Sequence, residues 1–262
     1  AGDLMEVIAL CDCDAGRLGP KAKKWGQAKT FSDYRKLLDD AETFKHLDAL
    51  VISAPDHHHA IPAAAAIKAG KHVYVQKPLT HTVFEARLLG RLAREHKVCS
   101  QMGNQGSAVA SLRRAVELIQ GGLIGNVTEC HVWTDRPREY WKQAPDVTKR
   151  PEGKFDVPKS VDWEAFLGPA PERPYAPGYH PMAWRGWQDF GTGAIGDMAC
   201  HTANMAFRAL KLAHPASLVA EAGGVNPETY TAWAHVTFKY PGRGDLPPVT
   251  LHWYEGKKDG KK

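Results

Sequence analysis

Short apolar runs alternate with helical segments through the first 122 residues, and this alternation constrains the fold more than any other sequence feature. The runs are almost continuously apolar, which is typical of strands covered on both faces. Strands that alternate with helices form a parallel sheet. We therefore predict a Rossmann-type, doubly wound α/β domain. Its expected strands cover residues 5–11, 47–53, 72–76 and 98–102, and its expected helices 14–25, 32–38, 61–69, 82–96 and 109–120.

The composition changes after residue 122. Residues 135–181 are rich in Pro, Trp, Tyr and Arg, and only residues 163–167 suggest a helical turn. The flanking segments predict a strand at 126–134, a helix at 194–210 and a mainly antiparallel sheet from strands at 217–222, 233–240 and 249–254. We predict an α/β domain at 1–122 and an α+β substrate and oligomerisation domain at 123–262. We expect the first to be incomplete at its N-terminus and the second at its C-terminus.

The bulk composition excludes two classes of function. The chain carries a net charge of only +5, with Lys and Arg scattered and no basic stripe interleaved with aromatics, so we expect no nucleic-acid partner. It has no apolar run of about 18 residues, so we expect no membrane span or membrane partner. The five cysteines form no CxxC pair, and we expect buried free thiols.

Polar or backbone-breaking residues follow each predicted parallel strand. Ligands bind outside the carboxyl ends of such strands, so these residues mark a candidate site. They are Asp12, Ser53-Ala54-Pro55-Asp56, Gln76-Lys77-Pro78 and Gly103-Asn104-Gln105.

Asp12 closes the first predicted strand. An acid there can accept hydrogen bonds from a ribose diol, and it favours NAD over NADP because it repels the extra phosphate. The alternative is an aspartate that caps the next helix or stabilises a turn. The glycine-rich phosphate loop belongs about twenty residues upstream, but only eleven residues precede Asp12. We expect either an N-terminally incomplete domain or a chain that binds no dinucleotide.

Three consecutive histidines, His57-His58-His59, suggest a metal site at first sight. Neighbouring residues point in different directions, and no second ligand cluster lies at zinc-like spacing. We therefore predict no metal. The run is instead expected to begin the next helix, whose N-terminal amides suit an anionic or polar ligand.

Lys77 lies where an apolar strand ends, and Pro78 follows it directly. Proline disfavours helical geometry at the preceding residue, which holds the lysine in place. A lysine at a reacting centre can donate or accept a proton. The alternative is an ordinary surface lysine at a strand end.

Asp197 and His201 are four residues apart on the helix expected after Gly191-Thr192-Gly193, so they share one face. Such a pair can shuttle a proton or bind a sugar diol. The preceding glycines can let the backbone approach a ligand closely. The alternative is an intrahelical hydrogen bond without chemistry.

Four motifs in order resemble the Gfo/Idh/MocA family of glucose–fructose oxidoreductases, inositol dehydrogenases and their relatives. Residues 54–59 (APDHHH) resemble the family's TPDHxH segment, and residues 76–79 (QKPL) resemble its EKPL segment. Residues 103–106 (GNQG) resemble the GNQG turn of one bacterial subgroup. The same subgroup has a WRGW…GDMGCH run, which resembles WRGW at 184–187 followed by GDMACH at 196–201. The resemblance covers roughly residues 7–210.

The resemblance implies an NAD-dependent oxidoreductase acting on the hydroxyl of a sugar, polyol or glycoside, with NADP less favoured. It implies that Lys77 lies beside the nicotinamide and the reacting carbon, and that Asp197 and His201 line the substrate pocket. We expect Lys77, His201 and Asp197 as catalytic residues, and substrate contacts from Lys77, Trp184, Arg185, Asp197 and His201. The expected cofactor-binding set is Asp12, Ser53, Pro55, His58, Gln76, Lys77, Pro78, Asn104 and Gln105.

Three positions depart from the family pattern, and each loses charge or titration. Gln76 replaces the glutamate of EKPL, Ser107 replaces a histidine after GNQG, and Asn204 replaces an aspartate after the GDMACH run. These departures leave open a non-catalytic nucleotide-binding relative. The resemblance also leaves open a redox-neutral glycosidase that uses NAD on the same fold. We also expect a homo-oligomer formed through the second-domain sheet. We expect a cytoplasmic location, or a periplasmic one if an upstream leader was lost with the missing N-terminus.

Overall fold

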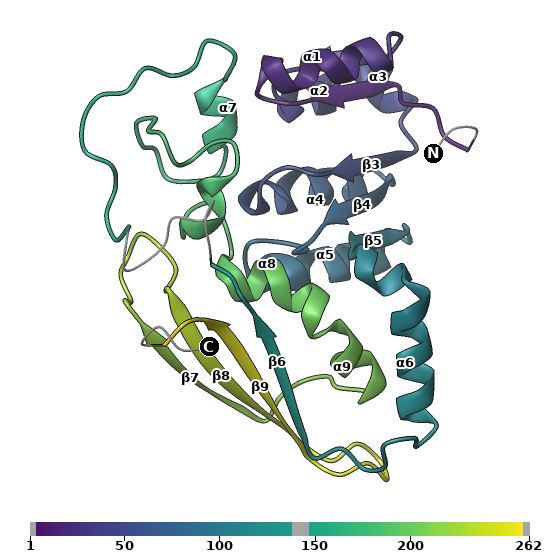
Figure 1. Ribbon diagram of the computed structural model, residues 1–262. Helices are drawn as coiled ribbons and strands as arrows, with labels where there is room; N and C mark the ends of the chain where they lie inside the picture. Colours follow the sequence, from purple (N-terminus) through teal and green to yellow (C-terminus); the bar gives the residue numbers. More distant parts are fainter. Residues whose placement is uncertain (1–3, 138–146, 259–262) are drawn as a thin grey trace. The chain divides into compact units, whose positions relative to one another are not determined.

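The computed structural model describes residues 4–137 and 147–258. The chain forms two compact units, one from residues 1–102 and 151–177 and the other from 103–150 and 178–262 (Figure 1). The boundaries of these units, which are defined by contacts, differ from those of the predicted domains 1–122 and 123–262. The two domains therefore stay a prediction. None of the helices in the described ranges is long and apolar enough to cross a bilayer.

The first unit contains short parallel strands alternating with helices. Strand β1 (Ala9–Cys11) pairs with β2 (Lys29–Phe31), and a second sheet has the order β3-β4-β5, formed by Ala49–Ile52, His72–Gln76 and Ser100–Gly103. Within it β3 and β4 are parallel. The helices are α1 (Ala15–Lys24), α2 (Tyr34–Asp39), α3 (Ala41–Lys45), α4 (Ala60–Lys68), α5 (Val83–Glu95) and α7 (Trp163–Leu167), with a 3-10 turn η1 (Asp56–His58) before α4.

The core of this unit shows why the apolar runs become strands. Val73 and Val75 of β4 are almost fully buried, and they pack with Ile67 of α4 and Leu89 of α5. Thr82 caps α5 through a capping box with Glu85, so the helix begins where the side-chain oxygen can accept the Glu85 N–H. Strand β4 is thus fixed by a core shared with α4 and α5, and it ends at Gln76, with Lys77 and Pro78 directly after it.

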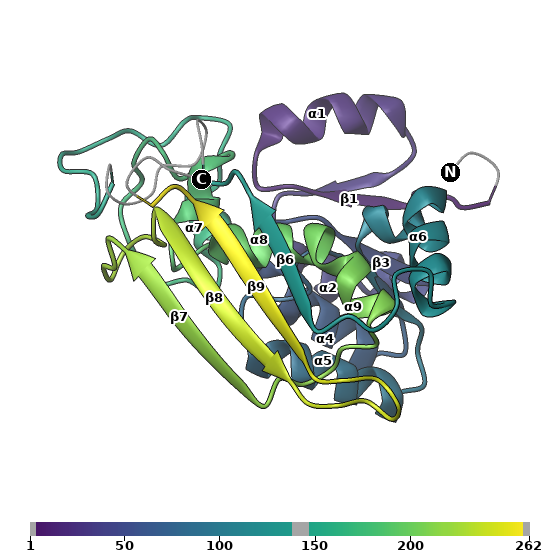
Figure 2. The same cartoon turned by 60° about the horizontal axis from the view of Figure 1, so that its bottom comes forward.

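The second unit is built on one four-stranded mixed sheet of order β6-β9-β8-β7. Strands β7 (Ser217–Gly223), β8 (Trp233–Tyr240) and β9 (Val249–Gly256) are antiparallel, while β6 (Glu129–Thr134) pairs in parallel with β9. Helices α8 (Gly193–Thr202) and α9 (Asn204–Ala209) lie on one side of this sheet (Figure 2). The unit also contains α6 (Ala110–Gln120) and the 3-10 turns η2 (Gln105–Ala108) and η3 (Ala183–Gly186).

Most expected elements form, and the differences have physical reasons. Strand β2 and helix α3 were not predicted, because three and five residues are too short to show a hydrophobic period. The helix expected at 194–210 is two helices that break at Ala203. The Thr202 hydroxyl donates to the Met198 carbonyl at 3.2 Å, and such bonds often bend a helix.

The cysteines differ from the expected buried thiols. All five are free, as predicted, but Cys11 and Cys99 are exposed and the other three are half-buried. The expected helical turn at 163–167 forms as α7, with Asp162 accepting the Ala165 N–H. Part of the long segment 135–181 lies outside the described residues.

Candidate active site

The carboxyl ends of β3 and β4 lie side by side in the first unit, because these strands are parallel neighbours. Ser53 follows β3 and is exposed, and Lys77 follows β4 and is half-buried. Gln76 Oε1 lies 3.3 Å from the Lys77 amide and accepts its proton. The Lys77–Pro78 peptide bond is cis. The fold therefore brings the expected residues Ser53, Pro55, Gln76, Lys77 and Pro78 to one edge of one sheet.

The three histidines lie in and after η1, ahead of α4, and their side chains are buried. The Nε2 atoms of His57 and His58 lie 3.0 and 2.7 Å from the same acceptor, the Phe166 carbonyl oxygen. The ring of His58 also meets the edge of Tyr34. Burial lowers the pKa of His58 and favours its neutral form. His58, expected in the cofactor-binding set, thus has its Nε2 directed at a backbone carbonyl of the same unit.

Among residues 4–137 and 147–258, no group of three or more His, Cys, Asp and Glu side chains has an arrangement that could hold a metal ion.

Asp12 lies at the end of β1 and has a local role. Its Oδ1 accepts the Asp14 N–H at 2.9 Å, which stabilises the turn into α1, and Asp14 in turn caps that helix. Burial and the carboxylate of Asp12 raise the pKa of the Cys13 thiol to about 12. The turn bond uses one carboxylate oxygen, so it is compatible with a further role of the other.

Asn104 carries an unsatisfied buried acceptor in the second unit. Its Nδ2 donates to the Ser107 hydroxyl at 3.1 Å, but its Oδ1 has no hydrogen-bond partner in the described structure. The residue is 8% exposed. Buried side-chain oxygens rarely stay unpaired, so this atom is suited to a donor from outside the chain. Gln105 next to it is exposed, and His201 Nδ1 lies 4.0 Å from the position a Cβ would take on Gly106.

Three of the expected substrate residues form one cluster in the second unit. The Arg185 guanidinium lies 4.2 Å from the centre of the Trp184 ring, and its Nε lies 3.4 Å from Asp197 Oδ1. Asp197 is 7% exposed and Trp184 is 6% exposed. The tertiary structure thus joins η3 to α8 through a charged pair supported by an aromatic ring.

The glycines before Asp197 serve packing within the protein, which corrects the expectation that they admit a ligand. A Cβ on Gly191 would lie 2.5 Å from the Arg185 carbonyl oxygen, and one on Gly193 would lie 2.7 Å from the Tyr230 ring. Gly193 also has a positive φ of +63°. Tyr230 fixes this turn further, because its hydroxyl donates to the Gly191 carbonyl at 2.9 Å.

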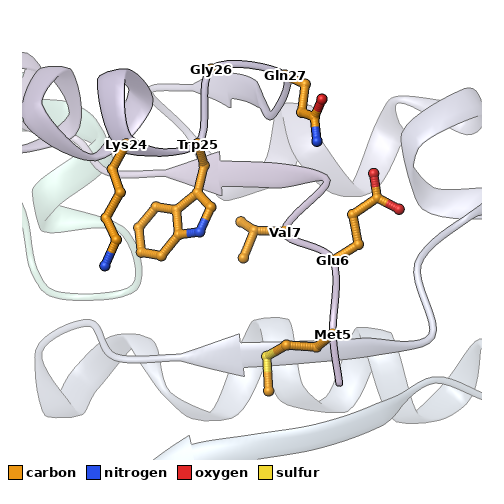
Figure 3. A pocket seen from close by; sticks show the side chains of 7 residues that line it. All are labelled: Met5, Glu6, Val7, Lys24, Trp25, Gly26 and Gln27. Carbon is orange, nitrogen blue, oxygen red and sulfur yellow. The ribbon is translucent and has the colours of Figure 1, made fainter. Parts of the chain in front are cut away.

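A pocket in the first unit is lined by other residues. They are residues 5–7 ahead of β1, Lys24 at the end of α1, and Trp25, Gly26 and Gln27 after it (Figure 3). Asp12 follows β1 at the strand's other end. The pocket therefore contains none of the residues expected from the sequence.

Sequence reasoning assigned no individual role to several buried titratable residues, of which His59 and Glu255 are two. His59 has both ring nitrogens directed at carbonyl oxygens, which no local pattern reveals. Glu255 is the penultimate residue of β9 and is 6% exposed. A signal for Glu255 was available, because it has the same strand parity as the buried residues Val249, Leu251 and Trp253.

Comparison with protein families gives two matches in chain order. Residues 1–104 match an oxidoreductase family model with an NAD-binding Rossmann fold, and residues 107–246 match the C-terminal alpha/beta domain model of an oxidoreductase family. These matches agree with the predicted order of a Rossmann-type domain followed by a second domain.

Two characterised relatives are similar over part of their length. Levoglucosan dehydrogenase of Pseudarthrobacter phenanthrenivorans is 24% identical over 186 residues, which is 71% of this chain and 37% of that protein. Inositol 2-dehydrogenase of Salmonella typhimurium is 30% identical over 129 residues, which is 48% of this chain and 37% of that protein. The aligned region is thus little more than a third of the length of each relative.

Solved structures show the same fold. Levoglucosan dehydrogenase in complex with NADH and levoglucosan matches with a TM-score of 0.63 at 17% identity, covering 94% of this chain and 57% of the other. The WlbA dehydrogenase from Bordetella pertussis, in complex with NADH and UDP-GlcNAcA, matches with a TM-score of 0.67 at 18% identity. The match covers 96% of this chain and 64% of the other. At these identities the likeness establishes the fold alone.

Proposed function

The chain belongs to the Gfo/Idh/MocA oxidoreductase family, and on that premise we propose that it acts as an NAD-dependent oxidoreductase on a hydroxyl of a sugar, polyol or glycoside. The observation that carries the proposal is the position of Lys77. It follows a core strand of a parallel sheet, at the edge where such sheets bind ligands. The relatives named for levoglucosan and inositol support a carbohydrate or polyol as the substrate class.

The residues present fit a dinucleotide in two respects. Asp12 follows a strand of the parallel β1–β2 pair, and its carboxylate can accept from a ribose diol. The unpaired, buried Oδ1 of Asn104 can accept from a carboxamide N–H or a hydroxyl. Ser53, Pro55, Gln76 and Pro78 at the carboxyl ends of β3 and β4, together with Gln105, complete the proposed binding set, while His58 contributes by positioning the start of α4.

Bound NAD would supply the hydride acceptor, which is the difficult part of alcohol oxidation. The chain must then remove the proton of the hydroxyl group. We assign this to the Lys77 amine, which accepts the proton as the carbon–oxygen bond becomes a carbonyl, and which returns it in the reverse direction. His201 is the second candidate for the same proton, because an imidazole can also exchange it near neutral pH.

The cluster of Trp184, Arg185 and Asp197 is proposed to bind substrate hydroxyls. Asp197 can accept two hydrogen bonds from a diol, and the Arg185 Nε, 3.4 Å from Asp197 Oδ1, orients the carboxylate. The buried Trp184 ring beneath the guanidinium restricts Arg185.

The test of this function is dinucleotide binding. Purified protein is denatured and the supernatant assayed for NAD(H) and NADP(H), and NADH is titrated into dinucleotide-free protein by calorimetry. We expect NADH to bind, and Asp12→Asn to weaken binding about tenfold, because a charge-assisted hydrogen bond contributes about 1.5–3 kcal/mol. Asp39→Asn is the control, since Asp39 is exposed at the end of α2. If neither nucleotide binds, the oxidoreductase proposal fails and a non-catalytic role takes its place.

We further propose that the chain associates through the sheet of the second unit. Helices α8 and α9 lie on one side of this sheet (Figure 2), and the other face bears a stacked group of His131, His252, His235 and Tyr254. Trp133 on the same face is 68% exposed. Large exposed aromatics favour association.

Sedimentation velocity tests the association. We expect Trp133→Glu to shift the protein toward monomer, because it places a charge on the face that would be buried. Val225→Glu is the matched control, since Val225 is 76% exposed and follows β7 in a loop. A monomer at all concentrations for the unsubstituted protein would contradict the proposal.

A further inference from the structure

His59 has an unusual hydrogen-bonding position at the carboxyl ends of β3 and β4. It is 1% exposed. Its Nδ1 lies 2.8 Å from the Pro78 carbonyl oxygen, and its Nε2 lies 2.8 Å from the Ala54 carbonyl oxygen. Ala54 follows β3 and Pro78 follows β4. One side chain therefore bridges the two strand ends that carry the proposed cofactor and proton-transfer residues.

The chemistry of this bridge depends on the number of protons on the ring. A carbonyl oxygen can only accept, so each of the two contacts requires an N–H on His59. A neutral imidazole carries one N–H and can satisfy one carbonyl, leaving a lone pair directed at the other. An imidazolium carries two and satisfies both. The geometry at 2.8 Å on both sides thus matches the doubly protonated ring.

The charges around His59 act in both directions. Burial lowers its pKa, and the ammonium of Lys77 lowers it further, while the two carbonyls and the carboxylate of Glu85 on α5 raise it. His58 is adjacent, and a charge on His59 lowers the pKa of His58, while the Asp56 carbonyl accepts the His59 amide proton at 3.2 Å. Burial is the largest of these influences, so the pKa of His59 is lowered on balance, and the geometry of the two carbonyls is what favours the second ring proton.

We propose that His59 is a positioning residue that clamps the ends of β3 and β4. Its bond to Pro78 fixes the backbone next to Lys77, and its bond to Ala54 fixes the backbone next to Ser53 and Pro55. Loss of one ring proton releases one of the two ends. The positioning role rests on the proposed function of Lys77, whereas the clamp rests on the geometry of His59 alone.

Two substitutions separate the two bonds. An asparagine amide nitrogen reaches the position of Nδ1 and a glutamine amide nitrogen the position of Nε2, so His59→Asn keeps the Pro78 bond and His59→Gln keeps the Ala54 bond. We expect His59→Gln to lower kcat about tenfold with little change in the Kd for NADH, because one lost hydrogen bond of about 1.4 kcal/mol corresponds to a factor of ten. We expect His59→Asn to do the opposite, raising the Kd for NADH while kcat changes little.

The control is His72→Gln. His72 begins β4, and its Nδ1 accepts the Cys99 N–H at 3.1 Å, so it bonds the backbone at the end of the strand opposite Lys77. This variant is expected to change neither kcat nor Kd. Oxidation of levoglucosan and of myo-inositol with NAD provides the kcat measurement. Equal losses of kcat and of NADH affinity in both His59 variants would indicate a merely structural role. They would overturn the assignment of the Pro78 bond to kcat and of the Ala54 bond to NADH affinity.

A spectroscopic measurement tests the clamp without any activity. In the full chain labelled with 15N at histidine, the Nδ1 and Nε2 resonances report the charge and tautomer of each ring. The resonances that are missing from the spectrum of His59→Asn are those of His59. As the pH rises we expect a change from two protonated nitrogens to one, at a lower pH than for an exposed histidine because burial lowers the pKa of His59. A single neutral tautomer throughout would overturn the clamp. If the unsubstituted chain binds no NADH, the positioning role fails, while the resonances still decide the clamp.

Discussion

Replacement of Lys77 by methionine is expected to lower kcat for alcohol oxidation about a thousandfold, within the range by which a positioned acid or base accelerates proton transfer. Methionine preserves the length of the side chain and removes its proton-transfer group. The Kd for NADH should change only slightly, because the backbone at Ala54, Gln76 and Pro78 is unaltered. Stopped-flow measurement of NADH formation together with calorimetric titration of NADH checks both parts of this expectation.

Two companion variants make the result specific. Lys77→Arg keeps a positive charge but cannot lose its proton near neutral pH, so it should be almost as inactive as the methionine variant. Lys71→Met is the control, since Lys71 precedes β4 at the other end of the strand and donates to the Lys45 carbonyl. Full activity of Lys77→Met would exclude Lys77 as the proton acceptor and transfer the assignment to His201.

The free energy of unfolding is expected to fall by about 3 kcal/mol between acidic and mildly alkaline pH because of Glu255. Burial raises the pKa of its carboxyl from 4.5 to about 7, although the Trp253 indole N–H and the Ile195 amide partly oppose this by bonding the carboxylate. A pKa difference of one between the folded and unfolded states is worth about 1.4 kcal/mol. The difference for Glu255 therefore corresponds to about 3 kcal/mol.

The sign follows from the direction of the change. The folded chain holds the Glu255 proton more tightly than the unfolded chain, so this contribution to stability is complete below about pH 4.5 and is lost as pH rises through about 7. Titration of His252 opposes it, because burial and the neighbouring histidines lower the pKa of His252 and favour its neutral form at higher pH. The contribution of Glu255 must therefore be measured by comparing the pH dependence of stability in the unsubstituted protein with that in a Glu255 variant.

Urea unfolding at about pH 5 and about pH 8 provides the measurement. Glu255→Gln should remove most of the difference in stability between the two pH values, since glutamine does not titrate. Glu221→Gln, on the exposed strand β7 of the same sheet, should leave that difference unchanged. An unchanged pH dependence in Glu255→Gln would mean that Glu255 is ionised in the folded protein throughout this range.

The parts of the fold that the sequence predicted correctly are those with strong local signals. Strands β4 and β8 have the predicted limits, and α5 begins directly after Thr82. A run of buried β-branched residues or a capping box needs only neighbours in the chain to be recognised. The placement of Lys77 at a strand end followed for the same reason, and the parallel pairing of β3 and β4 then confirmed that neighbouring strand ends meet.

The elements that the sequence did not reveal depend on partners distant in the chain. Strand β2 exists because it pairs with β1, and β6 is parallel to β9 although their paired positions, such as Glu129 and Thr250, lie 121 residues apart in the chain. The glycines at 191 and 193 suggested a ligand, yet Arg185 and Tyr230 occupy the space beside them. A glycine pattern indicates close approach but does not identify what approaches.

The sequence by itself determined the order of elements, the family and the strand end that carries Lys77, because apolar period and short motifs are local properties. The tertiary structure decided which polar atoms are paired. It directed both nitrogens of His59 at carbonyls five and nineteen residues away, paired Asp197 with Arg185, left Asn104 Oδ1 unpaired and buried Glu255. Burial and hydrogen bonding depend on segments that meet only after folding. The hydrogen-bond partners and the burial of these side chains could therefore not be predicted from their neighbours in the chain.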